Sequence, residues 1–271
     1  MNDQQLKTIL KDTFNSVSEG YDGNSLRFFP ESAKNMAALL NLSGDEQVLD
    51  VACGTGHASL AIAPLLRTGR ITAVDFSSGM LDQARQKAAA LDLRNITFVE
   101  RDMQDLGFPD GRFDVAVCAF GIFFVMDMET QLAHIASTVK PGGRVMICNF
   151  RENYFHPLKD MFINSMTRFG VQTPPQTWMR IAHEEGCRQL FTAAGLSNIR
   201  VEQKNVGYYL GSADDWWDIV WNAGYRRLVA QLSEMDQARF KKEHLEEIGK
   251  LKTDQGIWLD VGVLYTVGTK V

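Results

Sequence analysis

The sequence predicts a doubly wound α/β fold with a mostly parallel sheet of seven strands. From residue 47 onward, short apolar runs alternate with helical segments, which is the pattern of strand–helix–strand units. The early runs are almost continuously apolar, as expected of strands buried on both faces of a sheet. A glycine-rich turn follows the first run directly. Together these features predict an open sheet covered by helices on both sides.

Five strands are expected in the first half of the chain, and two more return late. The candidate runs are residues 48–52, 71–76, 96–100, 114–120, 144–149, 198–209 and 257–267. A helix is expected after Ser77, where Met80 and Leu81 begin an apolar face at helical spacing. The Pro-Gly-Gly motif at 141–143 is expected to end the preceding helical segment before the fifth strand.

The chain divides into three segments by its pattern. Residues 1–45 are expected to form an N-terminal helical lid, and residues 46–150 an α/β core that binds the cofactor. Residues 151–271 would supply the late strands together with helical segments at about 151–195 and 212–252. Because the second helical segment lies between two late strands, we expect it to be inserted into the core as a cap over the substrate.

Composition and charge exclude several classes of protein. The 271 residues include 28 basic and 33 acidic side chains, a net charge of −5 that disfavours a nucleic-acid binder. The doubled bases at 226–227 and 241–242 are interpreted as solvated helix faces. The longest apolar run, 115–126, falls short of the ~20 residues of a membrane span. The N-terminus lacks the build of a signal peptide, and the four cysteines lack metal-ligand spacing. We therefore expect a cytoplasmic protein without a metal, and its oligomeric state stays open.

A nucleoside site is predicted where the first two strands end, because ligands of open parallel sheets bind at that edge. Gly54 and Gly56 allow a tight turn that a ligand can approach closely. Asp75 ends the second strand, 19 residues after Gly56, and is placed to accept hydrogen bonds from ribose hydroxyls. Glycine turn and acid together point to a bound nucleoside.

The charge beside this turn favours a cationic ligand. Asp50 places a carboxylate where a pyrophosphate would be repelled and an ammonium or sulfonium group attracted. Ser59 stands where a nicotinamide-binding motif usually has its third glycine. Asp102, after the third strand, could accept from an exocyclic amine. A cationic adenosine ligand is favoured, and an NAD-dependent oxidoreductase remains the alternative.

Four motifs in the same order resemble the class I S-adenosylmethionine-dependent methyltransferases. They lie at residues 50–56, 74–77, 101–103 and 139–143, and the similarity covers residues 10–150 clearly. The most similar members are small-molecule enzymes grouped with the ubiquinone/menaquinone C-methyltransferases. The resemblance implies a Rossmann-like methyltransferase fold, S-adenosyl-L-methionine as cofactor with S-adenosyl-L-homocysteine as product, and a small-molecule acceptor.

The resemblance also implies roles for individual residues. Asp75 would hold the ribose hydroxyls, Phe76 and Met103 would flank the adenine, and carbonyl groups near Ala119 would receive the methionine ammonium. Tyr21 would close over the cofactor. The full set of implied cofactor residues is Tyr21, Asp50, Ala52, Cys53, Gly54, Gly56, Asp75, Phe76, Met80, Asp102, Met103, Ala119 and Phe120.

The chain departs from the family pattern in two places. Many members have glycine where this chain has Ala52, which should only tighten the turn. Residues 24–29 do not reproduce the longer pattern of the quinone methyltransferases, so methylation of a quinone is doubtful. The fourth strand also ends without the Asn/Asp-Pro-Pro-aromatic motif of amino-group methylation.

Aromatic residues suggest the acceptor side of the site. Phe124 follows the fourth strand, where the acceptor should enter. Trp217 and Trp221 recur at helical spacing, so this stripe either packs on the core or forms a lid over an apolar or aromatic acceptor. His156 is the one candidate for a catalytic base, and the catalytic residue is otherwise unknown.

The expected function is methyl transfer to a small acceptor by in-line displacement. A non-catalytic S-adenosylmethionine-binding protein is the alternative from another class. The acceptor and the atom that is methylated stay open.

Overall fold

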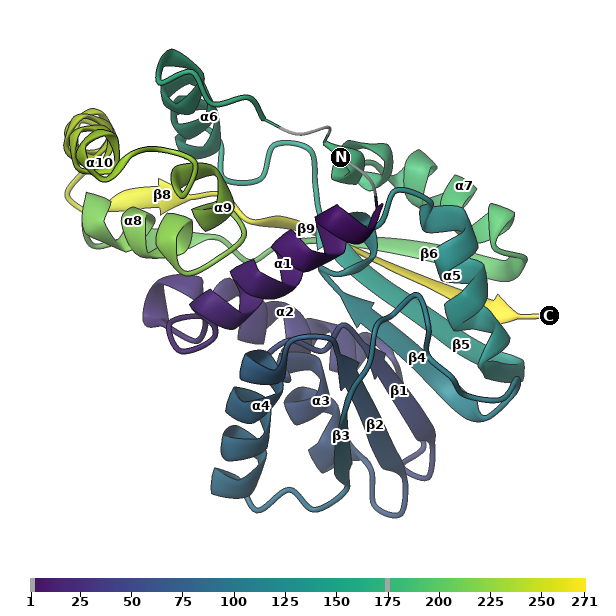
Figure 1. The fold of residues 1–271 in the computed structure, drawn as a ribbon. Coiled ribbons are helices and arrows are strands. Elements are labelled where there is room, and N and C mark those ends of the chain that lie inside the picture. The colour runs from purple at the N-terminus through teal and green to yellow at the C-terminus, as the bar shows by residue number, and fades with distance from the viewer. Residues whose placement is uncertain (1–2, 174–175) are drawn as a thin grey trace.

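A computed structural model describes residues 3–173 and 176–271, and its centre is a seven-stranded sheet in the order β3-β2-β1-β4-β5-β9-β6 (Figure 1). Strand β9 is antiparallel to both of its neighbours, and the pairings among β1 to β5 are parallel. The strands are β1 (Gln47–Val51), β2 (Arg70–Asp75), β3 (Ile96–Glu100), β4 (Phe113–Ala119), β5 (Val139–Phe150), β6 (Leu196–Asn205) and β9 (Gly262–Lys270). The predicted seven-stranded, mostly parallel sheet is confirmed.

Helices cover both faces of this sheet and build a separate core on each. Successive residues of β1 point to opposite faces, so Val48 packs into one core and Leu49 into the other. One face carries α2 (Phe28–Leu39), α3 (His57–Ile62) and α4 (Ser78–Ala90), and the other carries α5 (Met128–Ser137) and α7 (Glu184–Ala193). Short 3-10 helices η1 (Asn24–Leu26), η2 (Ala63–Leu65), η3 (Ile122–Phe124) and η4 (Thr177–Ile181) connect these elements.

The late helices form a group beyond one end of the sheet (Figure 1). This group contains α6 (Leu158–Arg168), α8 (Ala213–Trp221), α9 (Arg226–Val229) and α10 (Glu234–Gly249), with the two-stranded sheet of β7 (Tyr208–Leu210) and β8 (Ile257–Leu259). In its core, Trp216 Nε1 donates a hydrogen bond to His244 Nε2 at 2.8 Å, and both side chains are buried. The helical segment expected at 151–195 therefore divides, because α6 contacts α10 whereas α7 contacts β6 and α5.

Helix α1 (Asp3–Val17) runs between the sheet and the late helices (Figure 1). Asn15 Oδ1 accepts hydrogen bonds from Ser77 Oγ at 2.7 Å and from the Gly79 amide at 3.1 Å, which ties α1 to the start of α4. On the other side, the Arg226 guanidinium donates to the Ser16 carbonyl at 3.0 Å. The helix is thus fixed above the carboxyl ends of the strands.

Two expectations about the strands are wrong in detail. The runs 198–209 and 257–267 each divide into two strands, β6 with β7 and β8 with β9. The Pro-Gly-Gly motif lies inside β5 and does not precede it, because pairing with β4 begins at Val139 and shifts register before Arg144. Gly142, at φ +81°, lies in this irregular stretch. In the described residues, no helix is long and apolar enough to cross a bilayer.

Candidate functional site

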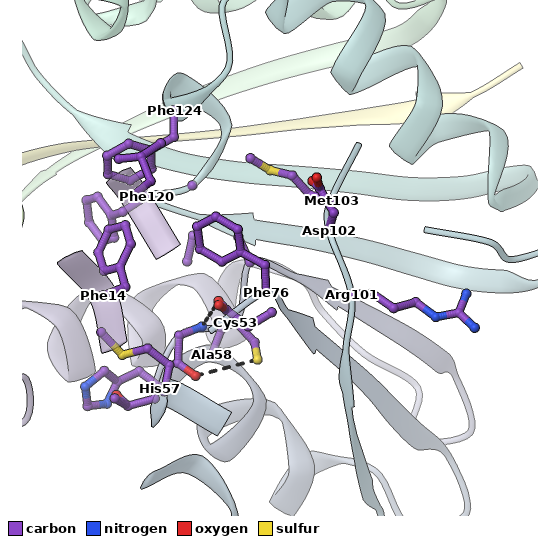
Figure 2. A pocket seen from close by; sticks show the side chains of 18 of the residues that line it. Phe14, Cys53, His57, Ala58, Phe76, Arg101, Asp102, Met103, Phe120 and Phe124 are labelled. Atoms are coloured by element: carbon purple, nitrogen blue, oxygen red, sulfur yellow. Dashed lines mark hydrogen bonds between the residues drawn. The ribbon is translucent and has the colours of Figure 1, made fainter. Parts of the chain in front are cut away.

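The residues that follow the first four strands line a pocket at the carboxyl end of the sheet, and α1 closes it from above. All predicted cofactor residues line this pocket except Asp50 and Gly56. Figure 2 shows Phe14, Phe120 and Phe124 on one side of it, Asp102 and Met103 on the other, and Phe76 between them. The topology therefore gathers side chains that are far apart in the sequence.

The loop after β1 turns through the left-handed region of backbone conformation. Gly54 has φ +54° and Gly56 has φ +85°, and the Gly56 amide donates to the Cys53 carbonyl at 2.8 Å. A Cβ at Gly54 would meet nothing within 4 Å, so the loop is open there, whereas a Cβ at Gly56 would lie 3.0 Å from Ala84 Cβ. The first glycine thus leaves room for a ligand, and the second lets α4 approach.

Two residues without glycine's freedom also adopt positive φ, at the ends of neighbouring strands. Ala52 follows β1 at φ +55°, and Phe120 follows β4 at φ +55°. Gly121, the residue after Phe120, lies against Ala52, since a Cβ there would come within 2.8 Å of Ala52 Cβ and 2.9 Å of Cys118 Sγ. Strained backbone of this kind is concentrated at functional sites. From the sequence, Ala52 was expected only to tighten the turn, and the positive φ of Phe120 was not predicted.

The Asp75 carboxylate is held by two backbone amides. Its Oδ2 accepts from Gly54 at 2.8 Å and its Oδ1 from Ser77 at 2.9 Å. Each oxygen keeps a second lone pair, so this carboxylate can accept two further donors. Burial raises the pKa of Asp75 to about 6, despite the hydrogen bonds from these amides.

The Asp50 carboxylate lies beneath the glycine loop and is fully buried. Its Oδ2 accepts from the Ser59 amide at 3.0 Å and from Ser59 Oγ at 2.6 Å, which fixes the start of α3. Its Oδ1 has no hydrogen-bond partner in the described part of the chain. Burial raises the pKa of Asp50 to about 7, and the charge of Asp75 adds to this effect. Asp75 lines the pocket and Asp50 lies beneath the loop that lines it, so both carboxyl groups favour a ligand that carries a positive charge.

Asp102 has partners of its own. Its Oδ2 lies 2.9 Å from Lys7 Nζ of α1, and its Oδ1 accepts from the Gln104 amide at 2.9 Å. The next residue, Met103, offers its carbonyl oxygen to Gln131 Nε2 at 2.7 Å. The acid predicted to meet an exocyclic amine thus also anchors the covering helix.

A second anchor of the N-terminal segment lies at Asp22. Its carboxylate accepts from Thr55 Oγ1 at 2.7 Å and lies 2.8 Å from His57 Nε2 and 2.7 Å from Lys87 Nζ. Although burial acts to raise it, these three contacts hold the pKa of Asp22 at about 2. The neighbouring Tyr21 stacks on Phe29 with ring centroids 5.0 Å apart. Sequence reasoning missed Thr55 and Lys87, because no motif joins them to Asp22.

A second cavity of about 580 Å³ adjoins the first, and its size is typical of small-molecule sites. The two share a set of mostly aromatic residues, Leu10, Phe14, Tyr21, Phe29, Phe120 and Phe124. Beyond this boundary, the second cavity is lined by residues from the end of β5, from α6 and from the η4 and α9 regions. Phe150, Tyr154 and Trp178 are among them, and Phe150 stacks on Tyr154 at 4.3 Å. Two connected chambers thus meet at an aromatic boundary.

The structure brings only part of the predicted acceptor side together. Phe124 lines both cavities, and its ring contacts that of Phe14 at 5.3 Å. Trp217 and Trp221 line neither cavity in the described residues. They stack on each other at 5.9 Å, and Trp217 packs 6.1 Å from Phe240, so the geometry favours the packing interpretation of this stripe.

His156 also lies outside the described cavity linings. Its Nδ1 is 2.7 Å from an Asp160 carboxylate oxygen, and 61% of its side chain is exposed. Sequence reasoning missed Trp178 and Arg227 of the second cavity. The interpretation of 226–227 as a solvated face is wrong for Arg227, because α9 is a single turn that turns this arginine toward the cavity.

Comparisons with known proteins give a consistent result. A family model described as "Methyltransferase domain" matches residues 48–143. Demethylmenaquinone methyltransferase of Bacillus licheniformis is 32% identical over 207 residues, which cover 69% of this chain and 88% of that protein. Aklanonic acid methyltransferase DauC of a Streptomyces species is 27% identical over 181 residues, covering 66% of this chain and 82% of that protein.

Solved structures agree on the fold. The YcgJ protein of Bacillus subtilis has a TM-score of 0.60 at 20% identity, covering 89% of this chain and 98% of that one. Phosphoethanolamine N-methyltransferase 2 of Haemonchus contortus, in complex with S-adenosyl-L-methionine, has a TM-score of 0.54 at 15% identity. It covers 89% of this chain and 52% of that one.

Proposed function

The chain belongs to the class I S-adenosylmethionine-dependent methyltransferases of the small-molecule type, and we propose that it methylates an apolar or aromatic acceptor held in the second cavity. The observation that carries this proposal is the pair of adjoining chambers. One is floored by carboxylates and the other is lined by aromatic rings, and the two meet at Phe14, Phe120 and Phe124.

The residues of the first chamber fit S-adenosyl-L-methionine. A cationic ligand suits the buried Asp50, whose Oδ1 has no partner in the described residues. The spare lone pairs of Asp75 suit two ribose hydroxyls, and the open face of Gly54 leaves space for close backbone approach. A nicotinamide dinucleotide fits less well, because its pyrophosphate would lie beside two buried acids.

We assign the remaining contacts from the positions of the lining residues. Phe76 and Met103 would flank the adenine, and Asp102 would accept from its amino group. Carbonyl groups near Ala119 and Phe120 would receive the methionine ammonium, and the half-buried Tyr21 would cover the cofactor. When bound, S-adenosyl-L-methionine supplies an electrophilic methyl group on a positively charged sulfur.

The chain's contribution to the transfer is alignment and exclusion of water. The rings of Phe14, Phe120 and Phe124 border both chambers, so they can hold the acceptor in line while keeping solvent from the junction. Helix α1 closes the same region and is fixed by Asn15 and Lys7. A well-aligned nucleophile requires little more than this geometry, because charge is neutralised in the transfer.

The second chamber favours an enzyme over a protein that only binds the cofactor. A pure binding protein has no use for an adjoining cavity of about 580 Å³ that shares its aromatic wall with the cofactor pocket. The names of two relatives refer to demethylmenaquinone and to aklanonic acid, and this supports a small organic acceptor.

The test combines binding with turnover. We expect S-adenosyl-L-homocysteine to bind to the full chain in calorimetry and to raise its melting temperature, whereas NAD should do neither. Methyl-labelled S-adenosyl-L-methionine should then label at least one member of a panel of phenols, quinols and aromatic acids. Failure of S-adenosyl-L-homocysteine to bind would refute the cofactor assignment. Cofactor binding with no labelling, even of panel members that bind, would favour the non-catalytic alternative.

A further inference from the structure

Arg227 brings a positive charge into the second cavity, beside its aromatic residues. It lies in α9, is partly buried, and lines this cavity but not the glycine-loop pocket. Among the described residues, its side chain has no hydrogen-bond or ion-pair partner. A partly desolvated guanidinium with free donors is stabilised when an anion meets it.

The other charged groups that line the cavity have partners. Asp160 lies 2.7 Å from His156 Nδ1, and Glu152 lies 3.5 Å from His183 Nε2. Lys159 Nζ donates to the Glu152 carbonyl at 3.1 Å and lies 4.3 Å from the centre of the Tyr154 ring. The charge of Arg227 is therefore left for something that enters from outside the chain.

Two tyrosine hydroxyls add a second donor beside Arg227. Tyr225 Oη donates to Tyr154 Oη at 3.0 Å, and both tyrosines line the same cavity as Arg227. One hydrogen bond between two hydroxyls uses only one of their two protons, so the pair retains a proton to donate. Burial raises the pKa of Tyr154 to about 12, which keeps that proton in place at neutral pH. Guanidinium and hydroxyl together form a cluster that offers donors to an anionic oxygen.

We propose that the acceptor is an aromatic compound with an anionic oxygen group, a carboxylate or an ionised hydroxyl, which Arg227 and the Tyr154–Tyr225 pair bind. The aromatic walls would hold its ring system, and Trp178 is one of them. Because Arg227 is absent from the lining of the glycine-loop pocket, the anion would anchor the acceptor at a distance from the junction between the chambers. Arg227 is thus a positioning and specificity residue. This inference rests on the proposed function, since it specifies the acceptor of that same site.

A matched pair of probes tests it, 2-naphthoate and the uncharged 2-naphthamide. Their binding to the full chain is measured by calorimetry in the presence of S-adenosyl-L-homocysteine. We expect the wild type to prefer the naphthoate, and Arg227→Met to weaken its binding by about tenfold or more, the usual effect of removing one charged hydrogen-bond partner. Binding of the naphthamide should change far less. Arg227→Lys should restore part of the preference, because it keeps the charge but loses the planar fork.

The neighbouring arginine provides the matched control. Arg226 lies in the same single turn, α9, but its guanidinium donates to the Ser16 carbonyl and lies 4.5 Å from the centre of the Trp221 ring. It is not among the described residues that line the cavity. Arg226→Met should therefore leave the preference for naphthoate intact. Equal affinity of the two probes for the wild type, equal weakening of both by Arg227→Met, or no binding of naphthoate would overturn the inference. Binding of S-adenosyl-L-homocysteine, measured in the same samples, tests the proposed function separately.

Discussion

Replacing Asp75 with asparagine should weaken the binding of S-adenosyl-L-homocysteine and remove a pH dependence that the wild type shows. The carboxylate accepts from the Gly54 and Ser77 amides through different oxygens. An asparagine has one such oxygen, so one amide would face an NH2 group instead. Hydrogen bonds to a charged group contribute about 1.5–3 kcal/mol each, so loss of one ribose contact alone should weaken binding about tenfold to a hundredfold.

The pH dependence follows from the raised pKa of Asp75, about 6. Ribose hydroxyls donate to the ionised carboxylate, so affinity should fall as pH decreases through 6, by about tenfold between pH 8 and pH 5. The unfolded chain would ionise this acid near its ordinary value of 3.8. The same raised pKa therefore makes the cofactor-free protein lose stability as pH rises from about 4 to 6.

Calorimetric titration with S-adenosyl-L-homocysteine between pH 5 and pH 8 measures both effects. Asp82→Asn is the control, because this exposed carboxylate on α4 pairs only with Arg85 at 2.8 Å in the described residues and should leave the titration unchanged. Binding by Asp75→Asn that is as tight as that of the wild type would refute the assigned role of Asp75. A wild-type affinity that does not change between pH 8 and pH 5 would refute it equally.

Three further perturbations test other parts of the site. Asp50→Asn should stabilise the cofactor-free protein at pH 8 by up to about 4 kcal/mol, but not at pH 4, because burial raises the pKa of Asp50 to about 7. Urea unfolding at both pH values measures this, and a difference in unfolding free energy between variant and wild type that is the same at both pH values would contradict it. Asn15→Ala removes both hydrogen bonds from α1 to the start of α4, so S-adenosyl-L-homocysteine should dissociate several-fold faster in stopped-flow measurements. An unchanged dissociation rate would contradict a covering role for α1. Trp178→Ala should weaken 2-naphthoate binding, because Trp178 lines the second cavity, whereas Trp221→Ala should only lower the melting temperature. Weaker 2-naphthoate binding by Trp221→Ala and unchanged binding by Trp178→Ala would favour the lid interpretation of Trp221.

The cofactor side could be predicted because its residues are tied to strand ends. Gly54 and Asp75 each follow or end a strand that is visible as an apolar run, and parallel strands bring their carboxyl ends to one edge. The left-handed conformation of Ala52 and Phe120 could not be predicted, because neither residue type favours positive φ. That conformation depends on the close approach of the two strand ends at Gly121.

The acceptor side was less predictable because helical periodicity identifies a buried face without saying what buries it. Trp217 and Trp221 follow the correct spacing, yet they stack on each other away from the cavities. Arg227 was invisible for the opposite reason, since a doubled arginine resembles a solvated face. The two arginines are consecutive residues of the single-turn helix α9 and point in different directions: Arg226 donates to Ser16 of α1, and Arg227 lines the cavity.

Different charged groups mark the two chambers, and this difference suits the chemistry proposed for them. Asp50 and Asp75 are buried carboxyl groups on the cofactor side, whereas on the acceptor side Arg227 lines the cavity without an ion-pair partner among the described residues. Arg227 favours an anionic acceptor in the second cavity, whereas the carboxyl group of Asp75 disfavours one in the cofactor pocket. The aromatic boundary at Phe14 and Phe120 excludes water between them, which leaves the attraction between acceptor and sulfonium unscreened along the line of transfer. A neutral acceptor would gain nothing from Arg227, and for that reason the charge of the acceptor, more than its size, should decide which compounds this enzyme methylates.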